Sequence, residues 1–385
     1  MVDNQIYYNY LYPSLEQIEL KVKKIKKMYT QDMVYINKIY KKFLYDFNIE
    51  MYYKVNTSHK KLVLKYIYEI INIFPQLNQI KISIFLHGSY AKGTNRLHSD
   101  IDLNFIYSEN LKNKIYVIEE LISLIICYVF DLGSRDHIHN MMIYSVNEEN
   151  IKKFKYYNIV FNNKKNITYS VRDTKTHLIN KIYKSKRGIN NFLFYIENAM
   201  KNYDIKEWCY SFISIENYND YKIEKKLSKI YNKYKGNKLF YAEIIQKEVK
   251  KILNTKCEFN KTFYIKSLNI NLKKYYGEVI QKFLIIFSKM NTNLKNVNFI
   301  DLWPYLEENK DLIVCICKYF WLLMRVEELC YLNHWDFSYK SEEMISCNQF
   351  NESYNKLFGK NFNEEFEKII YNLKVTIVEN YERMI

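Results

Sequence analysis

The stretch Ile84–Tyr107, IFLHGSYAKGTNRLHSDIDLNFIY, decides the fold of this chain. An apolar run leads into the pair Gly88-Ser89. After ten further residues, Asp100 and Asp102 flank a single isoleucine and open a second apolar run. The pattern predicts a strand, a tight turn, a short helix and a second strand. Because residues i and i+2 of a strand project from the same face, we expect the two aspartates to point the same way.

This arrangement favours a site for a metal ion and a polyphosphate. Two carboxylates so close together repel each other unless a cation lies between them, and hard oxygen ligands suit Mg²⁺, with Mn²⁺ as the alternative ion. Gly88 lets the backbone approach a bulky anion, and the turn and helix N-terminus offer free N–H groups to phosphates. Ser89 adds a hydroxyl donor. We therefore expect a nucleoside triphosphate and a divalent cation to bind here.

Gly88-Ser89, ten residues and then Asp100-x-Asp102 resemble the signature of the DNA polymerase β-like nucleotidyltransferase superfamily. Gly93-Thr94 in the connecting segment and Ser99, directly before the first aspartate, agree with that signature. The resemblance extends from the helix before the motif to the strands after it. It does not select a subfamily.

The resemblance implies an enzyme that moves a nucleoside monophosphate from a triphosphate, with ATP as the first candidate, to an acceptor hydroxyl. Asp100 and Asp102 would bind the metal, and Gly88, Ser89 and Ser99 would contact the nucleotide. The acceptor would attack the α-phosphorus in line, and pyrophosphate would leave. The acceptor stays open between a small molecule such as an antibiotic, an RNA end, a protein and a second nucleotide.

Members of the superfamily usually carry a third carboxylate, and this chain offers two candidates for it. Asp173 lies in the strand-like segment NITYSVRDT, and Asp131 follows a helix in YVFDLG. We favour Asp173 as the third catalytic residue and keep Asp131 as the alternative. The competing hypothesis is an inactive protein of the same fold that binds RNA or a protein partner, because neither carboxylate has a clean apolar setting.

The predicted fold class is α+β: a mixed sheet flanked by helices, followed by a mostly helical C-terminal domain. Only three prolines and seven glycines in 385 residues favour helices with few long loops. We expect a helical extension at residues 1–55, the nucleotidyltransferase catalytic domain at 56–180 and a helical acceptor-side domain at 181–385. Within the catalytic domain, Lys60–Phe74 has helical periodicity and Pro75 ends it. The two-domain layout is what the resemblance implies.

The formal net charge of +16 is unevenly distributed. Basic side chains are concentrated in residues 181–300, whereas residues 301–385 carry more acidic than basic side chains. The lysine-rich segment could bind a nucleic-acid backbone, or it could form amphipathic helices with lysine as the solvent-facing residue. We favour the second interpretation because only six of the 58 basic residues are arginine.

Seven cysteines without regular spacing argue against a disulfide framework. The sequence begins without a basic region followed by an apolar core, and its apolar stretches are too short for a bilayer, so we expect a cytoplasmic protein without a membrane partner. Near the C-terminus, four residues loosely resemble the last helices of aminoglycoside adenylyltransferases, although a plain helical bundle is the favoured interpretation. They are Arg325, Ser338, Lys340 and Glu342.

Overall fold

The computed structural model of the chain describes residues 15–75, 77, 82–87, 89–90, 93–97, 99, 101–107, 122, 125–126, 128–130, 213–214, 225, 229, 233, 238–255, 262–280, 283, 310–335, 337 and 342–382. Within 82–87, 102–107 and 213–214 it describes the backbone and, of the side chains, that of Ile84. Across these described parts of the chain, no helix combines the length and the apolar character needed to span a bilayer.

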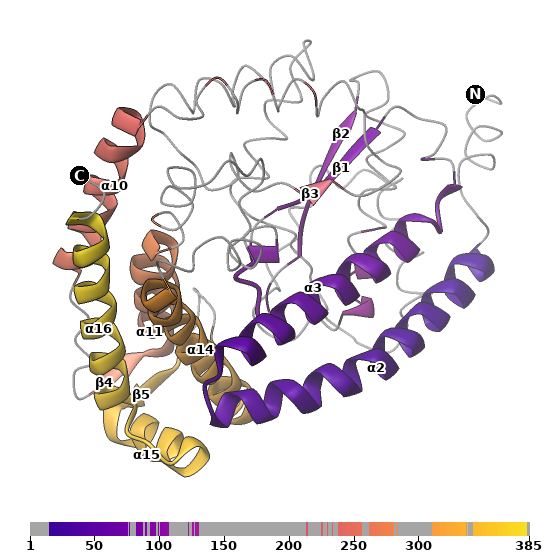
Figure 1. The fold of residues 1–385 in the computed structure, drawn as a ribbon. Coiled ribbons are helices and arrows are strands. Elements are labelled where there is room, and N and C mark those ends of the chain that lie inside the picture. The colour runs from indigo at the N-terminus through magenta and orange to yellow at the C-terminus, as the bar shows by residue number, and fades with distance from the viewer. Residues whose placement is uncertain are drawn as a thin grey trace.

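Two long helices, α2 (Leu15–Tyr45) and α3 (Ile49–Ile71), run side by side along the lower edge of the view in Figure 1. The Asn48 side chain accepts a hydrogen bond from the Met51 N–H at 3.0 Å and so caps the start of α3. The helix predicted over Lys60–Phe74 forms the second half of this longer element. Its last predicted residues lie beyond the end of α3.

Three strands form the sheet that carries the motif. β1 (Ile82–His87) pairs antiparallel with β2 (Asp102–Tyr107) on one side and with β3 (Ile213–Ser214) on the other, which gives the order β2-β1-β3. The two strands predicted on either side of the Gly-Ser turn are confirmed. All pairs among the described strands of this sheet are antiparallel, and its mixed character stays a prediction for the rest of the chain.

The described residues from 238 onwards are mostly helical, as predicted. Their helices are α10 (Lys238–Asn254), α11 (Ile265–Asn269), the π-helix η4 (Ile270–Gly277), α14 (Lys310–Leu332), α15 (Cys347–Phe358) and α16 (Phe362–Glu382). A short antiparallel sheet of β4 (Thr262–Tyr264) and β5 (Met344–Ser346) accompanies them. Most side chains of α14 are buried, so this helix forms the centre of the group.

Buried apolar side chains form two separate cores. The first, here called the motif core, surrounds the motif and consists of Ile18, Val22, Ile25, Tyr29, Val63, Tyr66, Ile67, Ile70, Ile71, Ile73, Phe74, Leu77, Ile84, Tyr90, Ile101, Ile122, Ile125, Ile126, Val129 and Phe130. The second, here called the helical core, consists of buried side chains from residues 245–377 together with Tyr40, Phe43, Leu44, Tyr52 and Val55.

Helices α2 and α3 contribute to both cores. The N-terminal half of α2 and the C-terminal half of α3 pack in the motif core, whereas the end of α2 and the start of α3 pack in the helical core. The pair is therefore a strap that joins the two parts of the molecule (Figure 1). Helix α3 runs without interruption across residues 55 and 56, and the predicted domain boundaries stay predictions.

Candidate functional site

The register between β1 and β2 brings two parts of the motif to the same end of the sheet. His87, the last residue of β1, lies opposite Asp102, the first residue of β2. Directly opposite Cα atoms in an antiparallel pair are about 4.5–5.5 Å apart. In the chain, Gly88-Ser89 directly follows His87, and Asp102 opens the second strand opposite it.

The predicted site residues fall into two groups. Ser89 and Ser99 are described in full, and Asp102 is described through its backbone. The other predicted residues lie outside the described residues: Gly88, Asp100, Asp131 and Asp173. The strand register places the Asp102 backbone opposite His87, two residues before Ser89. The roles of all the predicted site residues stay predictions.

Hydrogen bonds within the loop between the two strands shape the motif. The Thr94 N–H donates to the Ser89 carbonyl at 3.0 Å, which closes the turn around Ser89. Between them Gly93 has a φ of 76°, a left-handed conformation that favours glycine. These contacts explain why the Gly93-Thr94 pair follows the Gly-Ser turn at this spacing.

A second turn precedes the aspartates. The Arg96 N–H donates to Ser99 Oγ at 2.8 Å. The Ser99 N–H donates back to the Arg96 carbonyl at 3.1 Å. Ser99 is buried, and its hydroxyl therefore has a structural task directly before Asp100. Ile101 packs in the motif core, which anchors the chain between the two aspartates.

The Asn95 side chain is a buried polar group within this loop. It is 1% exposed, and neither polar atom of its amide has a hydrogen-bond partner among the described residues. An unsatisfied buried polar group costs about 1–3 kcal/mol. A buried amide of this kind between the Gly-Ser turn and the aspartates suits a polar ligand.

Two charged residues that the sequence analysis did not select hold the loop against α14. Arg96 Nε lies 2.7 Å from Glu327 Oε2, and these side chains are 12% and 5% exposed. The N–H is poorly directed for a hydrogen bond, so the contact is an ion pair. Lys273 of η4 reaches the other carboxylate oxygen of Glu327 at 2.8 Å. The rarity of arginine in this lysine-rich chain is the signal that could have identified Arg96.

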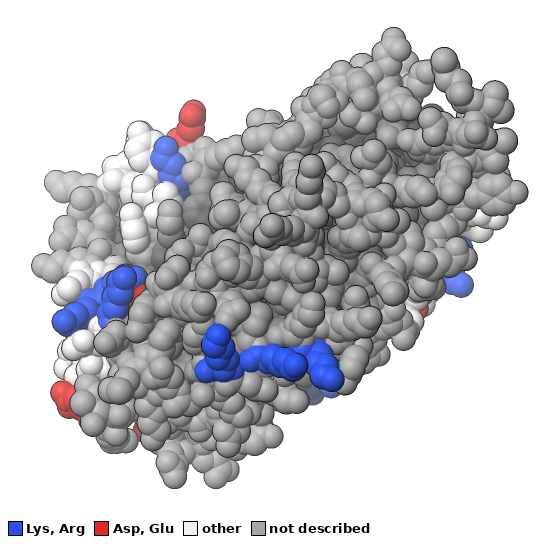
Figure 2. Space-filling model, turned by 90° about the horizontal axis from the view of Figure 1, so that it is seen from above, with Lys and Arg blue, Asp and Glu red and all other residues white. Residues whose placement is uncertain are grey.

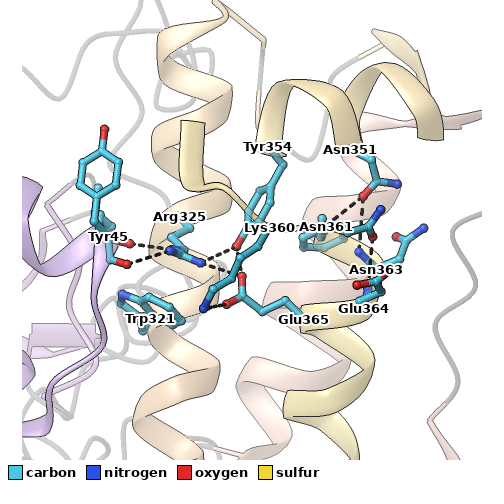
Figure 3. A network of polar contacts seen from close by, with 12 residues as sticks. Tyr45, Trp321, Arg325, Asn351, Tyr354, Lys360, Asn361, Asn363, Glu364 and Glu365 are labelled. Carbon is cyan, nitrogen blue, oxygen red and sulfur yellow. Dashed lines mark hydrogen bonds and ion pairs between the residues drawn. The ribbon is translucent and has the colours of Figure 1, made fainter. Parts of the chain in front are cut away.

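Arg325, considered above for its resemblance to another enzyme group, has a structural role. Its guanidinium donates to the carbonyls of Leu44 and Tyr45 at 2.6 and 3.2 Å. It also forms a 2.6 Å ion pair with Glu365 and lies 3.9 Å from the centre of the Trp321 ring (Figure 3). Each of its three side-chain nitrogens donates within the fold, which supports the interpretation as a plain helical bundle.

The predicted metal site consists of carboxylates, whose hard oxygen atoms suit Mg²⁺. Among the described side chains, no group of three or more histidine, cysteine, aspartate or glutamate residues could hold a metal ion. Asp100 and the Asp102 carboxylate lie outside that set. The described cysteines, Cys315, Cys317, Cys330 and Cys347, are free thiols.

Basic side chains are visible on the face shown in Figure 2, where they form a short row among the described residues. Lys225, Lys229 and Lys233 are each helical and exposed, and they are spaced four residues apart in the sequence. A lysine row of this kind fits both a solvated helix face and a contact to phosphates. It therefore leaves the acceptor open.

Comparison with known proteins identifies the domain that contains the motif. The family model described as a nucleotidyltransferase domain matches residues 67–179, a range that includes β1, the loop, β2 and the aspartates predicted as catalytic or metal-binding residues. No curated protein matches the chain. The chain thus carries a nucleotidyltransferase domain over residues 67–179, as the resemblance of its motif to the DNA polymerase β-like superfamily predicts.

Proposed function

We propose that the protein is a Mg²⁺-dependent nucleotidyltransferase that moves a nucleoside monophosphate from a triphosphate to an acceptor hydroxyl. The observation that carries the proposal is the register of the strand pair, in which Asp102 lies opposite His87, the residue that precedes Gly88-Ser89 in the chain. The nucleotidyltransferase domain at residues 67–179 supports transferase activity in general. ATP is the donor we expect first.

In this proposal the two ends of the loop have different tasks. Gly88 and Ser89 bind the phosphates through backbone N–H groups and a hydroxyl. Asp100 and Asp102 supply the hard carboxylate oxygens that Mg²⁺ or Mn²⁺ prefers. When bound, such an ion supplies charge neutralisation for the triphosphate and for the attacking oxygen. The buried amide of Asn95 adds a polar group between these two ends.

The reaction is an in-line displacement at the α-phosphorus. The acceptor oxygen forms a bond to this phosphorus, and the bond to the bridging oxygen of the β-phosphate breaks, so that pyrophosphate leaves with the electron pair. The hydroxyl proton passes to a carboxylate or to water. Asp173 is the residue we propose for the third carboxylate, with Asp131 as the alternative.

The test is pyrophosphate release from each of the four nucleoside triphosphates with Mg²⁺, in the presence of RNA oligonucleotides, aminoglycosides or protein as acceptors. Asp102→Asn should lower the rate about 100-fold or more, because it removes a charge that acts on the transition state. Asp32→Asn, the same substitution in an exposed ion pair of α2, is the matched control and should retain the rate. An unchanged rate in Asp102→Asn would contradict the proposal.

The same assay decides the competing hypothesis. An inactive protein of this fold would release no pyrophosphate from any donor with any acceptor, yet would bind RNA or a protein partner tightly. Labelled RNA in a filter-binding measurement, run with the same preparation, distinguishes this outcome from an unfolded sample.

A further inference from the structure

The loop that links the Gly-Ser turn to the aspartates is fastened to a helix far away in the sequence. Arg96 leaves the loop and forms its ion pair with Glu327 of α14, while Leu97, the next residue, packs against the helical core. Neighbouring positions of one loop thus contact the C-terminal helices by charge and by apolar burial. The conformation of the motif therefore depends on residues outside the nucleotidyltransferase domain.

The surroundings of this ion pair make it strong. Tyr40 of α2 and Tyr52 of α3 are fully buried in the helical core. Burial raises the pKa of both hydroxyls well above the ordinary value, and the field of Arg96 lowers the pKa of each. Both hydroxyls consequently stay neutral, and Arg96 lies among buried groups in a medium of low dielectric constant. Charges attract far more strongly there than at the surface.

The side chain of Arg96 acts on the aspartates through its own backbone. The Arg96 N–H and carbonyl both bond to Ser99, and Asp100 is the next residue after Ser99. A shift of Arg96 would therefore move the turn that delivers the first aspartate. Ile101 is held separately in the motif core, so the displacement would be concentrated between residues 96 and 100.

We propose that Glu327 is a positioning residue for nucleotidyl transfer: through Arg96 it fixes the turn before Asp100 relative to the Gly-Ser turn. This inference rests on the proposed function. It deepens that function, because it assigns to α14 a residue that positions the site. Lys273 holds the second oxygen of Glu327 and so fixes the carboxylate itself.

The experiment compares Glu327→Gln and Arg96→Met with a matched control. Glu365→Gln breaks another buried arginine–glutamate pair of the helical region, at 2.6 Å, without touching the loop. If Glu327 positions the aspartates, Glu327→Gln and Arg96→Met should lower kcat for pyrophosphate release about tenfold or more, since small misplacements of reacting groups are costly. Glu365→Gln should retain kcat at temperatures where it remains folded, and Arg96→Lys should recover part of the loss.

Two further readouts do not depend on turnover. In hydrogen exchange, peptides covering residues 89–107 should exchange about tenfold faster in Glu327→Gln and Arg96→Met, and not in Glu365→Gln, because local opening follows lost local contacts. In calorimetry with Mn²⁺, the non-hydrolysable analogue α,β-methylene-ATP should bind more weakly to the first two variants alone.

The outcomes separate the two proposals. If kcat, exchange and analogue binding change in all three variants in proportion to their thermal stability, the role of Glu327 is only structural and the inference is overturned. It is equally overturned if Glu327→Gln leaves loop exchange unchanged. If the wild-type protein releases no pyrophosphate but the loop and the analogue respond as expected, the proposed function fails while the positioning contact stands.

Discussion

Among single residues, Asp32 shows how a surface carboxylate ties α2 to α3. It accepts hydrogen bonds from Lys65 at 2.9 Å and from Tyr66 at 2.8 Å. These two bonds are the main reason that the pKa of Asp32 lies below its usual value. Asp32 also lines an open hollow of about 460 Å³ between the two helices, which contains none of the predicted site residues.

The lowered pKa fixes the sign of a pH effect. Because folding depresses the pKa of Asp32, its contribution to stability is present above the unfolded value near 3.8 and is lost as the pH falls through the folded value. In this ion pair the side chains of Lys65 and Asp32 are 50% and 41% exposed. Solvent screening therefore limits the contribution of the pair to the stability of the fold. Asp32→Asn should cost about 0.5 kcal/mol at pH 7.

Urea unfolding of the wild type and Asp32→Asn at several pH values tests this expectation. The difference between the two proteins should shrink as the pH falls below 4 and should also shrink in high salt. A difference that grows on acidification would contradict the assignment of the shift to Lys65 and Tyr66.

At the level of single residues, the sequence predicted the motif but did not predict the residues that hold its loop in place. The two strands β1 and β2 followed from the two apolar runs and the turn between them. The pairing of Arg96 with Glu327 could not follow, because the two residues are distant in sequence and a single lysine-rich chain gives no measure of which charges meet. The Ser99 hydroxyl accepts a hydrogen bond from the Arg96 N–H. The position of Ser99 before Asp100 did not predict this bond, and its contact with the nucleotide stays a prediction.

On the level of elements, the C-terminus of α2 is held by the buried guanidinium of Arg325. The last carbonyls of a helix lack partners within it, and Arg325 supplies donors to two of them, those of Leu44 and Tyr45. Glu365 balances the charge, and the Tyr354 hydroxyl donates to the same carboxylate at 2.6 Å. Burial raises the pKa of Tyr354, so this donor stays protonated.

Arg325→Met should therefore lower the free energy of unfolding by about 3–5 kcal/mol, because it leaves a buried carboxylate without its main partner. Lys360→Met is the matched control, since Lys360 contacts the same carboxylate at 3.2 Å from an exposed position, and should cost less than about 1 kcal/mol. Urea unfolding followed by circular dichroism measures both. Equal losses in the two variants would contradict the role of the buried contact.

Several elements were predictable and others were not. The helix over Lys60–Phe74 was expected from its periodicity, but its start at Ile49 depends on the Asn48 cap, which a periodicity count does not weigh. The π-helix η4 has an ordinary helical sequence, and its wider register is stabilised by tertiary contacts such as the bond from the Tyr319 hydroxyl to the Leu272 carbonyl. Strand β3 is two residues long and carries too little pattern to be recognised.

For the whole molecule, the strap of α2 and α3 couples the two cores. Ile18 packs in the motif core near the start of α2, and Phe43 packs in the helical core near its end. Trp321 of α14 donates to the Phe43 carbonyl at 2.8 Å. A change in either core is therefore transmitted along a continuous helix of 31 residues.

Coupling of the cores predicts that distant substitutions shift one common transition. Ile18→Ala should cost about 2–5 kcal/mol and Phe43→Ala about 3–5 kcal/mol, because each leaves a cavity in a packed core. Each variant should lower the midpoint of a single urea transition, seen alike by tryptophan fluorescence and circular dichroism. Two separate transitions in Ile18→Ala would mean that the cores unfold independently.

The mostly helical character of the described residues was predictable from the few glycines and prolines in the sequence. The packing of the N-terminal helices into both cores was only partly predictable from the sequence. The sequence predicted a helical extension at residues 1–55. The first half of α2 packs with residues 63–130, whereas its end packs with residues 245–377, about two hundred or more positions further along the chain.

During translation, the strap of α2 and α3 is made before the residues that complete its packing. Helices α2 and α3 emerge from the ribosome before α14, yet Arg325 of α14 donates to the Leu44 carbonyl across 281 residues of chain. Contacts of such high sequence separation form slowly. Tyr40, Phe43 and Leu44 thus stay only partly covered until residues 310–377 have been translated. A nascent chain that stalls before that point exposes an apolar helix face and is predisposed to aggregate.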